Sequence, residues 1–457
     1  MSGTPTIPSN EAQPDKSKLR RAITGSAVGN ATEWFDYGAY AYVSTEITAN
    51  FFPEYGYVGT ALGFAISFVL RPLGGLFWGP LGDRIGRQKV LATTIVLMAA
   101  STFLVGCLPT YDSIGVWAIV LLFALRTLQG FSTGGEYGGA ATYMAECAPD
   151  KRRGFYGSFL EFGTIVGFTA AIVVVFVTES IIGDAAMSEW GWRIPFLIGG
   201  PIGIIGLYIR TRLEETPVFK ELEAEDAVES GTATALKDLF ALFWKPILTL
   251  IGLVLALNVA NYTLLAYMAT YLQDRAGFSS SDADLLVIVG QVAMLVFLPI
   301  AGAVSDKVGR KPMWGGSFLG LIVLSIPMFL LIGQGFWPAV IGFTVLGIVY
   351  IAQLATISAT FPAMFPSQVR YGGMAIGYNI STAAFGGTAP LVNDALIGAT
   401  GNELVPAYYM MGASAVGLIA LFFVVETAGK SIRGTEIPGT PESEAELAEL
   451  DSLDKTV

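Results

Sequence analysis

The sequence predicts an all-α integral membrane protein in which twelve transmembrane helices form two similar six-helix halves. Only 14% of the 457 residues are charged and 53% are hydrophobic, whereas soluble domains carry about 25% charged residues. Apolar stretches of about 20 residues, which is the length that crosses a bilayer as a helix, recur along the chain. A charged motif also recurs after about half the chain, which indicates two equivalent halves in parallel orientation.

Twelve apolar spans can be placed along the chain, and they divide into two groups of six. The first six lie at about 22–50, 57–81, 88–108, 115–145, 155–178 and 192–210. The second six lie at about 245–272, 284–304, 312–332, 337–361, 371–398 and 405–426. We therefore predict an N-terminal arm, an N-terminal bundle, a central cytoplasmic loop, a C-terminal bundle and an acidic tail, at 1–21, 22–210, 211–243, 244–426 and 427–457.

The motif that marks the two halves is a short charged segment between apolar spans. It reads GDRIGR at 82–87 in the first half and returns as SDKVGR at 305–310 in the second. Its Asp and Arg side chains can pair with each other and with a neighbouring helix end, and its glycine permits a tight turn. We predict a cytoplasmic gate motif made of Asp83, Arg84, Gly86, Arg87, Asp306, Gly309 and Arg310. The alternative is that these charges only anchor the loops at the membrane surface.

The uneven distribution of Lys and Arg predicts the orientation in the membrane. Of the 26 such residues, all but four lie in the tails and in the loops of one side. Arg71 and Arg126 lie inside spans, and Arg193 and Arg275 lie on the other side. Because positively charged loops remain cytoplasmic, we predict a multi-pass protein of the inner (plasma) membrane with both termini cytoplasmic.

The composition excludes several kinds of function. The chain has no histidine, which removes histidine metal sites and histidine proton relays, so a proton carrier would have to be a carboxylate, with a tyrosine as the alternative. No cluster of catalytic residues is visible at membrane depth, and the polar segments are too short for a large sensory output domain. We therefore expect no enzyme activity, no cofactor, no metal and no nucleic-acid partner.

Charged residues inside the first span point to function. A charge at the bilayer centre costs about 2.5–3.5 kcal/mol on insertion scales. Glu33, Tyr37 and Tyr40 lie on one face of the predicted helix, and Asp36 lies at the edge of that face. We predict that Glu33 and Asp36 carry protons and that the two tyrosines bind substrate. The alternative is that both carboxylates only pair with Arg71 or with arginines of the loops.

The fourth span carries a polar face formed by Arg126, Gln129, Glu136 and Tyr137. Arg126 and Glu136 are about 15 Å apart along a helix axis, so each needs another partner or a ligand. The planar guanidinium of Arg126 fits a substrate carboxylate. Burial of Glu136 favours its neutral form, as a proton carrier requires. A structural polar contact is the alternative for either residue.

Neutral polar and aromatic residues replace these charges in the second half. Asn258 and Tyr262 lie in the seventh span and Tyr378 in the eleventh. Such groups suit a ligand of little net charge, and aromatic faces attract quaternary ammonium groups. Hydrogen bonding between helices or core packing is the alternative for each residue alone. The predicted substrate site comprises Arg126, Gln129, Tyr37, Tyr40, Tyr137, Asn258, Tyr262 and Tyr378.

With its twelve spans and long central loop, the chain resembles the major facilitator superfamily. The loop motif of that family, G-x-x-x-D-R-x-G-R-[RK], is matched by GPLGDRIGRQ at 79–88, with Gln88 off the pattern. The first half resembles the metabolite:proton symporters in four segments, GNATEWFD at 29–36, RPLGG at 71–75, QGFSTGGEY at 129–137 and WGWRIPF at 190–196. The second half is most similar to the proline/glycine betaine members, at 251–272 and 361–381. It lacks the C-terminal coiled coil that many of them carry.

The resemblance implies a secondary transporter that imports a small polar metabolite with protons by moving two halves around a central site. The expected substrate is a zwitterionic osmolyte of the proline or glycine betaine type. The alternative is an organic acid such as 2-oxoglutarate, citrate or shikimate. Such acids should need additional buried Arg or Lys residues in the second half, and none is found in the middle of a span there. We expect the transporter to function as a monomer within the lipid bilayer.

Overall fold

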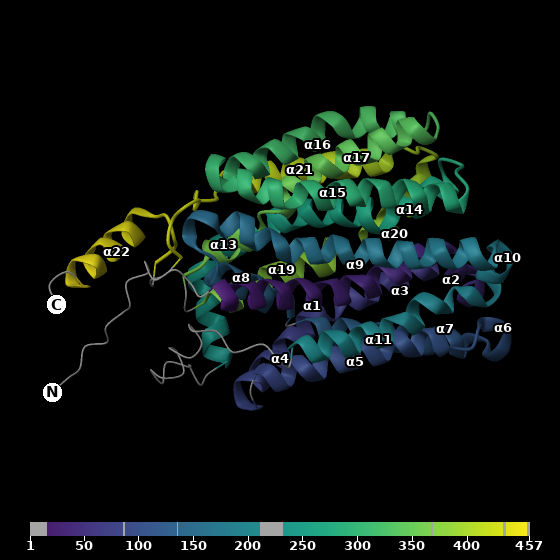
Figure 1. Cartoon of the computed structure of the whole chain (residues 1–457), viewed down its shortest axis with the longest axis horizontal. Coiled ribbons are helices and arrows are strands. Elements are labelled where there is room, and N and C mark those ends of the chain that lie inside the picture. Colours follow the sequence, from purple (N-terminus) through teal and green to yellow (C-terminus); the bar gives the residue numbers. More distant parts are fainter. Residues whose placement is uncertain are drawn as a thin grey trace.

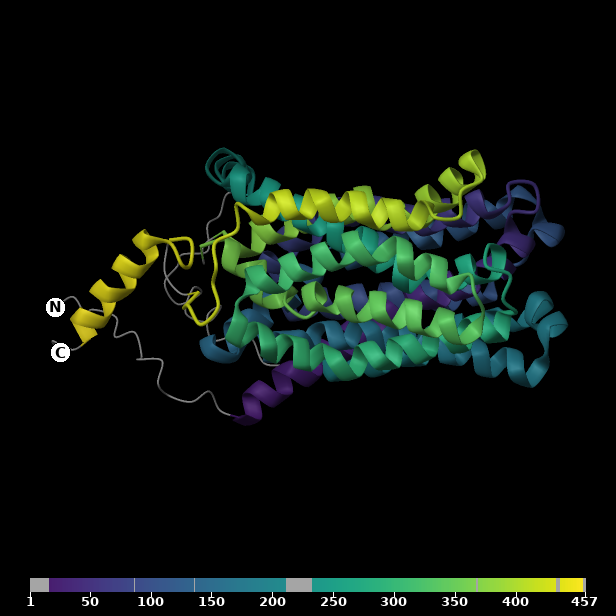
Figure 2. The ribbon, with the colours of Figure 1, turned by 90° about the horizontal axis from the view of Figure 1, so that it is seen from above.

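The computed structural model describes residues 16–85, 87–134, 136–210, 232–366, 369–432 and 436–454. Within these ranges the secondary structure is helical, and no strand is present. The helices run lengthwise through one elongated bundle (Figures 1 and 2).

The first half contains a series of helices in which several predicted spans are divided into consecutive pieces. In chain order they are α1 (Lys16–Tyr42), α2 (Ser44–Phe51), α3 (Tyr57–Val69), α4 (Arg71–Ile85), α5 (Arg87–Cys107), α6 (Tyr111–Ile114), α7 (Val116–Thr133), α8 (Glu136–Cys147), η1 (Asp150–Arg152), α9 (Arg153–Ile182), α10 (Asp184–Ala186), η2 (Met187–Gly191) and α11 (Arg193–Arg210).

The second half repeats this arrangement and ends in a helix outside the bundle. Its elements are α13 (Thr232–Asn261), η3 (Tyr262–Tyr267), α14 (Met268–Asp274), α15 (Ser280–Val308), α16 (Arg310–Ile332), α17 (Phe336–Leu354), α18 (Ile357–Thr360), η4 (Pro362–Met364), α19 (Arg370–Ser381), η5 (Thr382–Gly386), α20 (Ala389–Thr400), α21 (Val405–Leu421) and α22 (Pro441–Asp454).

Each predicted span coincides with one helix or with consecutive helices. In the described part of the chain, seven helices are long and apolar enough to cross a membrane, and three shorter ones are also apolar. The two remaining spans are helical but interrupted, the first after Tyr42 and the eleventh by η5. Helices α1 and α13 begin inside the segments predicted to be polar, while 1–15 and 211–231 lie outside the described residues.

Two ends of the bundle are distinguished by the elements found there. Helix α22 lies beyond one end, and α10 lies at the opposite end (Figure 1). We call them the α22 end and the α10 end. Helix α9 of the first half packs along α1 and also along α15 of the second half, so these three helices form the central seam between the halves.

Glycines permit close contact along this seam. A Cβ on Gly163 or Gly167 of α9 would lie 2.2 Å from the carbonyl oxygen of Ala27 or 2.5 Å from that of Ala31, both on α1. Toward the α22 end, a Cβ on Gly154 of α9 would lie 2.6 Å from the carbonyl oxygen of Gly302 on α15. Small residues at such contacts let helix backbones approach closely in membranes. The two halves are therefore packed tightly together at the α22 end.

Candidate functional site

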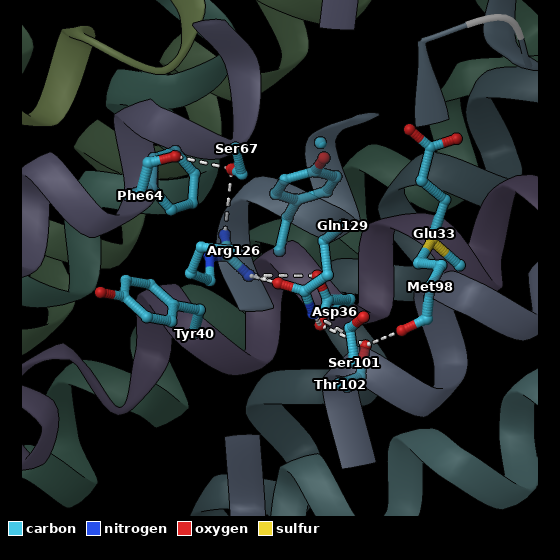
Figure 3. Close-up of polar contacts among 12 residues, drawn as sticks. Glu33, Asp36, Tyr40, Phe64, Ser67, Met98, Ser101, Thr102, Arg126 and Gln129 are labelled. Carbon is cyan, nitrogen blue, oxygen red and sulfur yellow. Dashed lines mark hydrogen bonds and ion pairs between the residues drawn. The ribbon is translucent and has the colours of Figure 1, made fainter. Parts of the chain in front are cut away.

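Arg126 and Asp36 form a buried ion pair in the first half. Nη1 of Arg126 lies 3.2 Å from Oδ2 of Asp36 and donates at 2.9 Å to Oε1 of Gln129. Oδ1 of Asp36 accepts hydrogen bonds from Gln129 and from Thr102, each 2.7 Å long. Figure 3 shows these side chains converging from α1, α5 and α7. The carboxylate therefore has a charged donor on Oδ2 and two neutral donors on Oδ1, which together compensate for the burial of its charge.

The remaining groups around Arg126 occupy the rest of its guanidinium. Nη2 donates to Oγ of Ser67 at 3.2 Å, and the guanidinium carbon lies 4.3 Å from the ring centroid of Tyr40. Helix α7, which carries Arg126, can approach α3 closely because Gly130 faces the backbone of Ser67. A Cβ on Gly130 would lie 1.8 Å from the carbonyl oxygen of Ser67. Three predicted site residues of the first half, Gln129, Tyr40 and Asp36, thus surround a fourth, Arg126.

A second buried ion pair lies one helical turn earlier on α1. Nη2 of Arg71 donates to Oε1 of Glu33 at 2.7 Å. The Arg71 guanidinium carbon lies 4.9 Å from the ring centroid of Tyr37 and 4.7 Å from that of Phe68. Glu33 therefore pairs with Arg71, which is the alternative to a proton-carrying role that the sequence allowed. Nε of Arg71 has no hydrogen-bond partner among the described residues.

Aromatic rings from both halves cluster beside this ion pair. Tyr262 begins η3 and places its ring centroid 5.2 Å from that of Phe68 and 6.0 Å from those of Phe64 and Trp34. The Tyr262 hydroxyl is buried and has no hydrogen-bond partner in the described part of the chain. A π-helical turn such as η3 often occurs at functional sites. We call Trp34, Tyr37, Phe64, Phe68 and Tyr262 the aromatic cluster.

Tyr137 and Tyr378 join the two halves at another point of the interior. Their rings stack at a centroid distance of 4.3 Å and an interplanar angle of 15°. The Tyr137 hydroxyl donates a hydrogen bond to Glu161, whose other oxygen accepts one from Thr164 at 2.9 Å. Two predicted site residues are therefore in contact, and they connect to a buried carboxyl group on α9.

Asn258 and Glu136 are the remaining predicted site residues with described side chains in the interior. Nδ2 of Asn258 donates to Oγ1 of Thr382 at 3.0 Å, which links α13 to η5. Hydrogen bonding between helices is the alternative to substrate binding that the sequence allowed for Asn258. Glu136 is the first residue of α8 and is buried, a position where the positive end of the helix dipole favours a carboxylate.

The second copy of the gate motif connects the two halves at the α22 end. Asp306 accepts hydrogen bonds from the backbone amides of Gly154 and Phe155, both 2.8 Å long, and one from Nη2 of Arg310 at 2.7 Å. It thereby caps α9 of the opposite half. Gly309 has a φ of 104° in the turn between α15 and α16, which favours glycine.

Most of the first copy of the motif falls on residues whose side chains the structure does not describe. Gly86 lies outside the described residues, and so do the side chains of Asp83, Arg84 and Arg87. The gate role predicted for the two copies stays a prediction.

The predicted site does not include Arg71 or Glu161, although both belong to the buried polar network. Each is a charged residue inside an apolar stretch of the sequence, and that signal alone could have selected them. Their partners come from distant parts of the chain, since Arg71 pairs with Glu33 and Glu161 with Tyr137.

Comparisons with known families and proteins agree with this architecture. The family model of the Major Facilitator Superfamily matches residues 28–389 and 251–450. The chain is 43% identical to the ectoine/proline transporter ProP of Corynebacterium glutamicum over 95% of this chain and 89% of that protein. It is also 43% identical to the proline/betaine transporter of Escherichia coli K12, over 92% of this chain and 86% of that protein.

A solved structure shares the fold at lower identity. The structure of a D-xylose-proton symporter aligns with a TM-score of 0.69 and 20% identity, over 91% of this chain and all of that chain. The resemblance noted in the sequence, to the superfamily and to its proline/betaine group, is confirmed by these matches. The chain therefore belongs to the Major Facilitator Superfamily, whose members are multi-pass membrane transport proteins and not enzymes.

Proposed function

We propose that this protein is a proton-coupled symporter that imports a small zwitterionic osmolyte of the proline or glycine betaine type. The names of its relatives support the substrate class. One relative is named as an ectoine/proline transporter, and another is named as a proline/betaine transporter. A third, from Dickeya dadantii, is 40% identical and is named for glycine betaine, proline, ectoine and pipecolic acid. Each of these compounds combines a carboxylate with a positively charged nitrogen.

The observation that carries this proposal is the aromatic cluster beside the Arg71–Glu33 pair. Aromatic faces attract a quaternary ammonium group, and an arginine fork fits a carboxylate. Arg71 contacts the rings of Tyr37 and Phe68, and Tyr262 of the second half packs on Phe68. A zwitterion placed between the two halves would meet both kinds of group at once. The other proposed contacts are Gln129, Tyr40, Tyr137, Asn258 and Tyr378.

Asp36 and Arg126 are proposed to couple the proton to the substrate. The Arg126 guanidinium is engaged by Asp36 and Gln129 in the structure. Protonation of Asp36 removes the charge that holds Arg126, so the guanidinium becomes available to a substrate carboxylate. Proton and substrate would then favour each other's binding. Glu33 and Glu136 remain the other proposed proton carriers.

The orientation follows from the positive charges. We propose that the termini and the loop 211–243 are cytoplasmic, so that the α22 end faces the cytoplasm and the α10 end faces the outside. The bundles 22–210 and 244–426 would tilt against each other as units, in a monomer, and expose the central site alternately at the two ends. The gate motif would close the cytoplasmic end.

Uptake into proteoliposomes tests this function. We expect labelled proline or glycine betaine to accumulate when the outside is more acidic than the lumen. Substrate should also evoke an inward positive current, because a zwitterion adds no net charge to the proton that accompanies it. A protonophore should abolish the accumulation. Accumulation of 2-oxoglutarate or citrate in place of the zwitterions would overturn the substrate class, and accumulation that survives the protonophore would overturn the coupling.

A further inference from the structure

A buried carboxyl group, that of Asp284, lies at the α10 end of the seam between the halves, within electrostatic reach of two other carboxyl groups. Asp284 lies on α15, Glu179 near the end of α9, and Glu46 on α2. Asp284 has an exposed fraction of 0%, and neither of its oxygens has a hydrogen-bond partner among the described residues. The charged groups that act on it electrostatically are Glu179 and then Glu46. The two groups that act on this buried carboxyl group are thus carboxyl groups as well, and neither can supply a compensating positive charge.

Neighbouring hydrogen bonds hold this end of the seam closed. Oγ of Ser280 donates to Glu179 at 2.9 Å, and Nε2 of Gln291 donates at 2.6 Å to the hydroxyl of Tyr42. That hydroxyl in turn donates to the carbonyl oxygen of Leu265 at 2.7 Å. Each of these contacts joins the first half to the second. Asp284 therefore lies inside the contact that must separate when the transporter opens at the α10 end.

Among the described residues, the other titratable groups near Asp284 do not supply it with a positive charge. The Tyr42 hydroxyl lies within the electrostatic reach of Asp284, and Glu179 lies within that of Asp184 on α10. Helix α14 ends in Asp274, while the adjacent Arg275 pairs with Asp394 at 2.8 Å. The sequence of α17, which also packs on α15, contains no charged residue.

An ionised Asp284 is therefore unfavourable in the closed state. Removing one ion from water into a protein costs several kcal/mol unless a partner compensates for it. A bound metal ion would be one form of compensation, but no group of three or more carboxylates or cysteines with the geometry of a metal site occurs in the described residues. A single proton on Asp284 removes the charge without any further ligand.

We propose that Asp284 is a proton-binding site of the gate at the α10 end, protonated when the halves close there and ionised when they part. The inference rests on the proposed function for its direction, since the α10 end then faces the outside. External protons would bind Asp284 in the open gate and favour its closure. This site is separate from Asp36 and Arg126, and it does not contact substrate.

Infrared spectroscopy of the purified protein tests the protonation directly. Asp284→Asn should remove intensity from the carbonyl-stretch band of protonated carboxyl groups at neutral pH. Asp282→Asn, which changes an exposed carboxylate two residues away on the same helix, should leave that band unchanged. An undiminished band in Asp284→Asn would overturn the proposal. Because this measurement involves no transport, it can succeed even if the protein turns out to carry a different substrate.

Cysteine labelling tests the link to the gate. In a chain without Cys107 and Cys147, a cysteine replaces Ser44, which is buried in the seam and contacts Thr270 at 2.9 Å. Its labelling rate, divided by that of a cysteine at exposed Ser281, should rise with external pH by up to about tenfold per pH unit for a gate coupled to one proton. Asp284→Asn should abolish this rise and keep labelling slow. An unchanged pH response would refute the link, as would a response to sodium instead of protons.

Discussion

The two halves share an architecture but bury different chemistry. The first half encloses two ion pairs, Arg71 with Glu33 and Arg126 with Asp36. The corresponding interior of the second half holds neutral contacts, such as the hydrogen bonds from Asn258 to Thr382 and from the Tyr350 hydroxyl to Asn261 at 2.6 Å. These two buried ion pairs thus belong to the first half, whereas the carboxyl group of Asp284 in the second half is buried at the α10 end. We infer that the first half couples the proton to the substrate at these ion pairs, while the second half contributes neutral polar groups and the Tyr262 ring to the substrate site.

The largest effect is expected from breaking a buried ion pair. Arg126→Ala leaves Asp36 as an uncompensated buried charge, which should lower the free energy of unfolding by about 3–5 kcal/mol. In the second half, Asn258→Ala removes one neutral hydrogen bond and should cost only about 0.5–1.5 kcal/mol. Thermal unfolding of the purified variants in detergent measures both. Adding Asp36→Asn to Arg126→Ala should restore part of the lost stability. Equal costs in the two halves would contradict the comparison.

A smaller effect is expected at the contact that joins the halves at the α22 end. Asp306→Asn weakens the hydrogen bonds to the Gly154 and Phe155 amides, and hydrogen bonds to charged groups contribute about 1.5–3 kcal/mol each. The equilibrium should shift toward opening at this end. A cysteine at Ser358, which is buried against α9, should then be labelled at least about tenfold faster.

Glu444→Gln serves as the control for that measurement. It removes one partner of the exposed Lys430–Glu444 pair at the same end, and exposed pairs contribute about 0–1 kcal/mol. Labelling at Ser358 should stay as in the unmodified chain. If Asp306→Asn has no more effect than this control, the motif serves only to anchor the loop.

Coupling should depend on carboxylates of the first half. With one proton per substrate, a difference of one pH unit supports about tenfold accumulation. Asp36→Asn imitates the protonated state, so it should retain exchange of labelled substrate across the membrane but lose this accumulation. Glu136→Gln tests the second proposed carrier in the same assay. Tenfold accumulation that persists in both variants would transfer the role to Glu33 or Glu161.

The aromatic cluster should discriminate between substrates. Tyr262→Ala removes a ring from the aromatic cluster and should weaken glycine betaine binding by about 0.5–2 kcal/mol, the range of a cation–π contact. Proline, whose nitrogen is not quaternary, should be affected less. Tyr262→Phe keeps the ring and removes only a hydroxyl without a hydrogen-bond partner among the described residues, so betaine affinity should remain. Equal losses in Ala and Phe variants, measured by equilibrium binding, would exclude the ring as the recognition element.

The acidic tail should have the smallest effect. Removal of 435–457 takes away α22, which lies outside the bundle (Figure 1). Its contact with the preceding segment includes the exposed Lys430–Glu444 pair, and such pairs contribute little. Uptake per transporter in the membrane should therefore be nearly unchanged. A clear loss of uptake at equal abundance would assign the tail a role in transport.

The sequence by itself determined the class of fold and the kinds of residue in the site. Apolar length located the spans, because a helix must satisfy its own backbone hydrogen bonds in lipid. The cost of a charge in the membrane indicated that Glu33, Asp36, Arg126 and Glu136 are candidate functional residues. Both inferences use properties that each segment carries locally, so no knowledge of its neighbours was needed.

Only the tertiary structure decided which of these residues act together. Glu33 and Asp36 are three residues apart on α1, yet their arginines come from α4 and α7. Likewise, Asp284 appears in the sequence as an ordinary residue near the start of a span, and its burial depends on α9 packing against α15. The physical reason is that ion pairing and desolvation depend on distances between helices. Those distances are set by glycine contacts across the bundle and not by the pattern within any one helix.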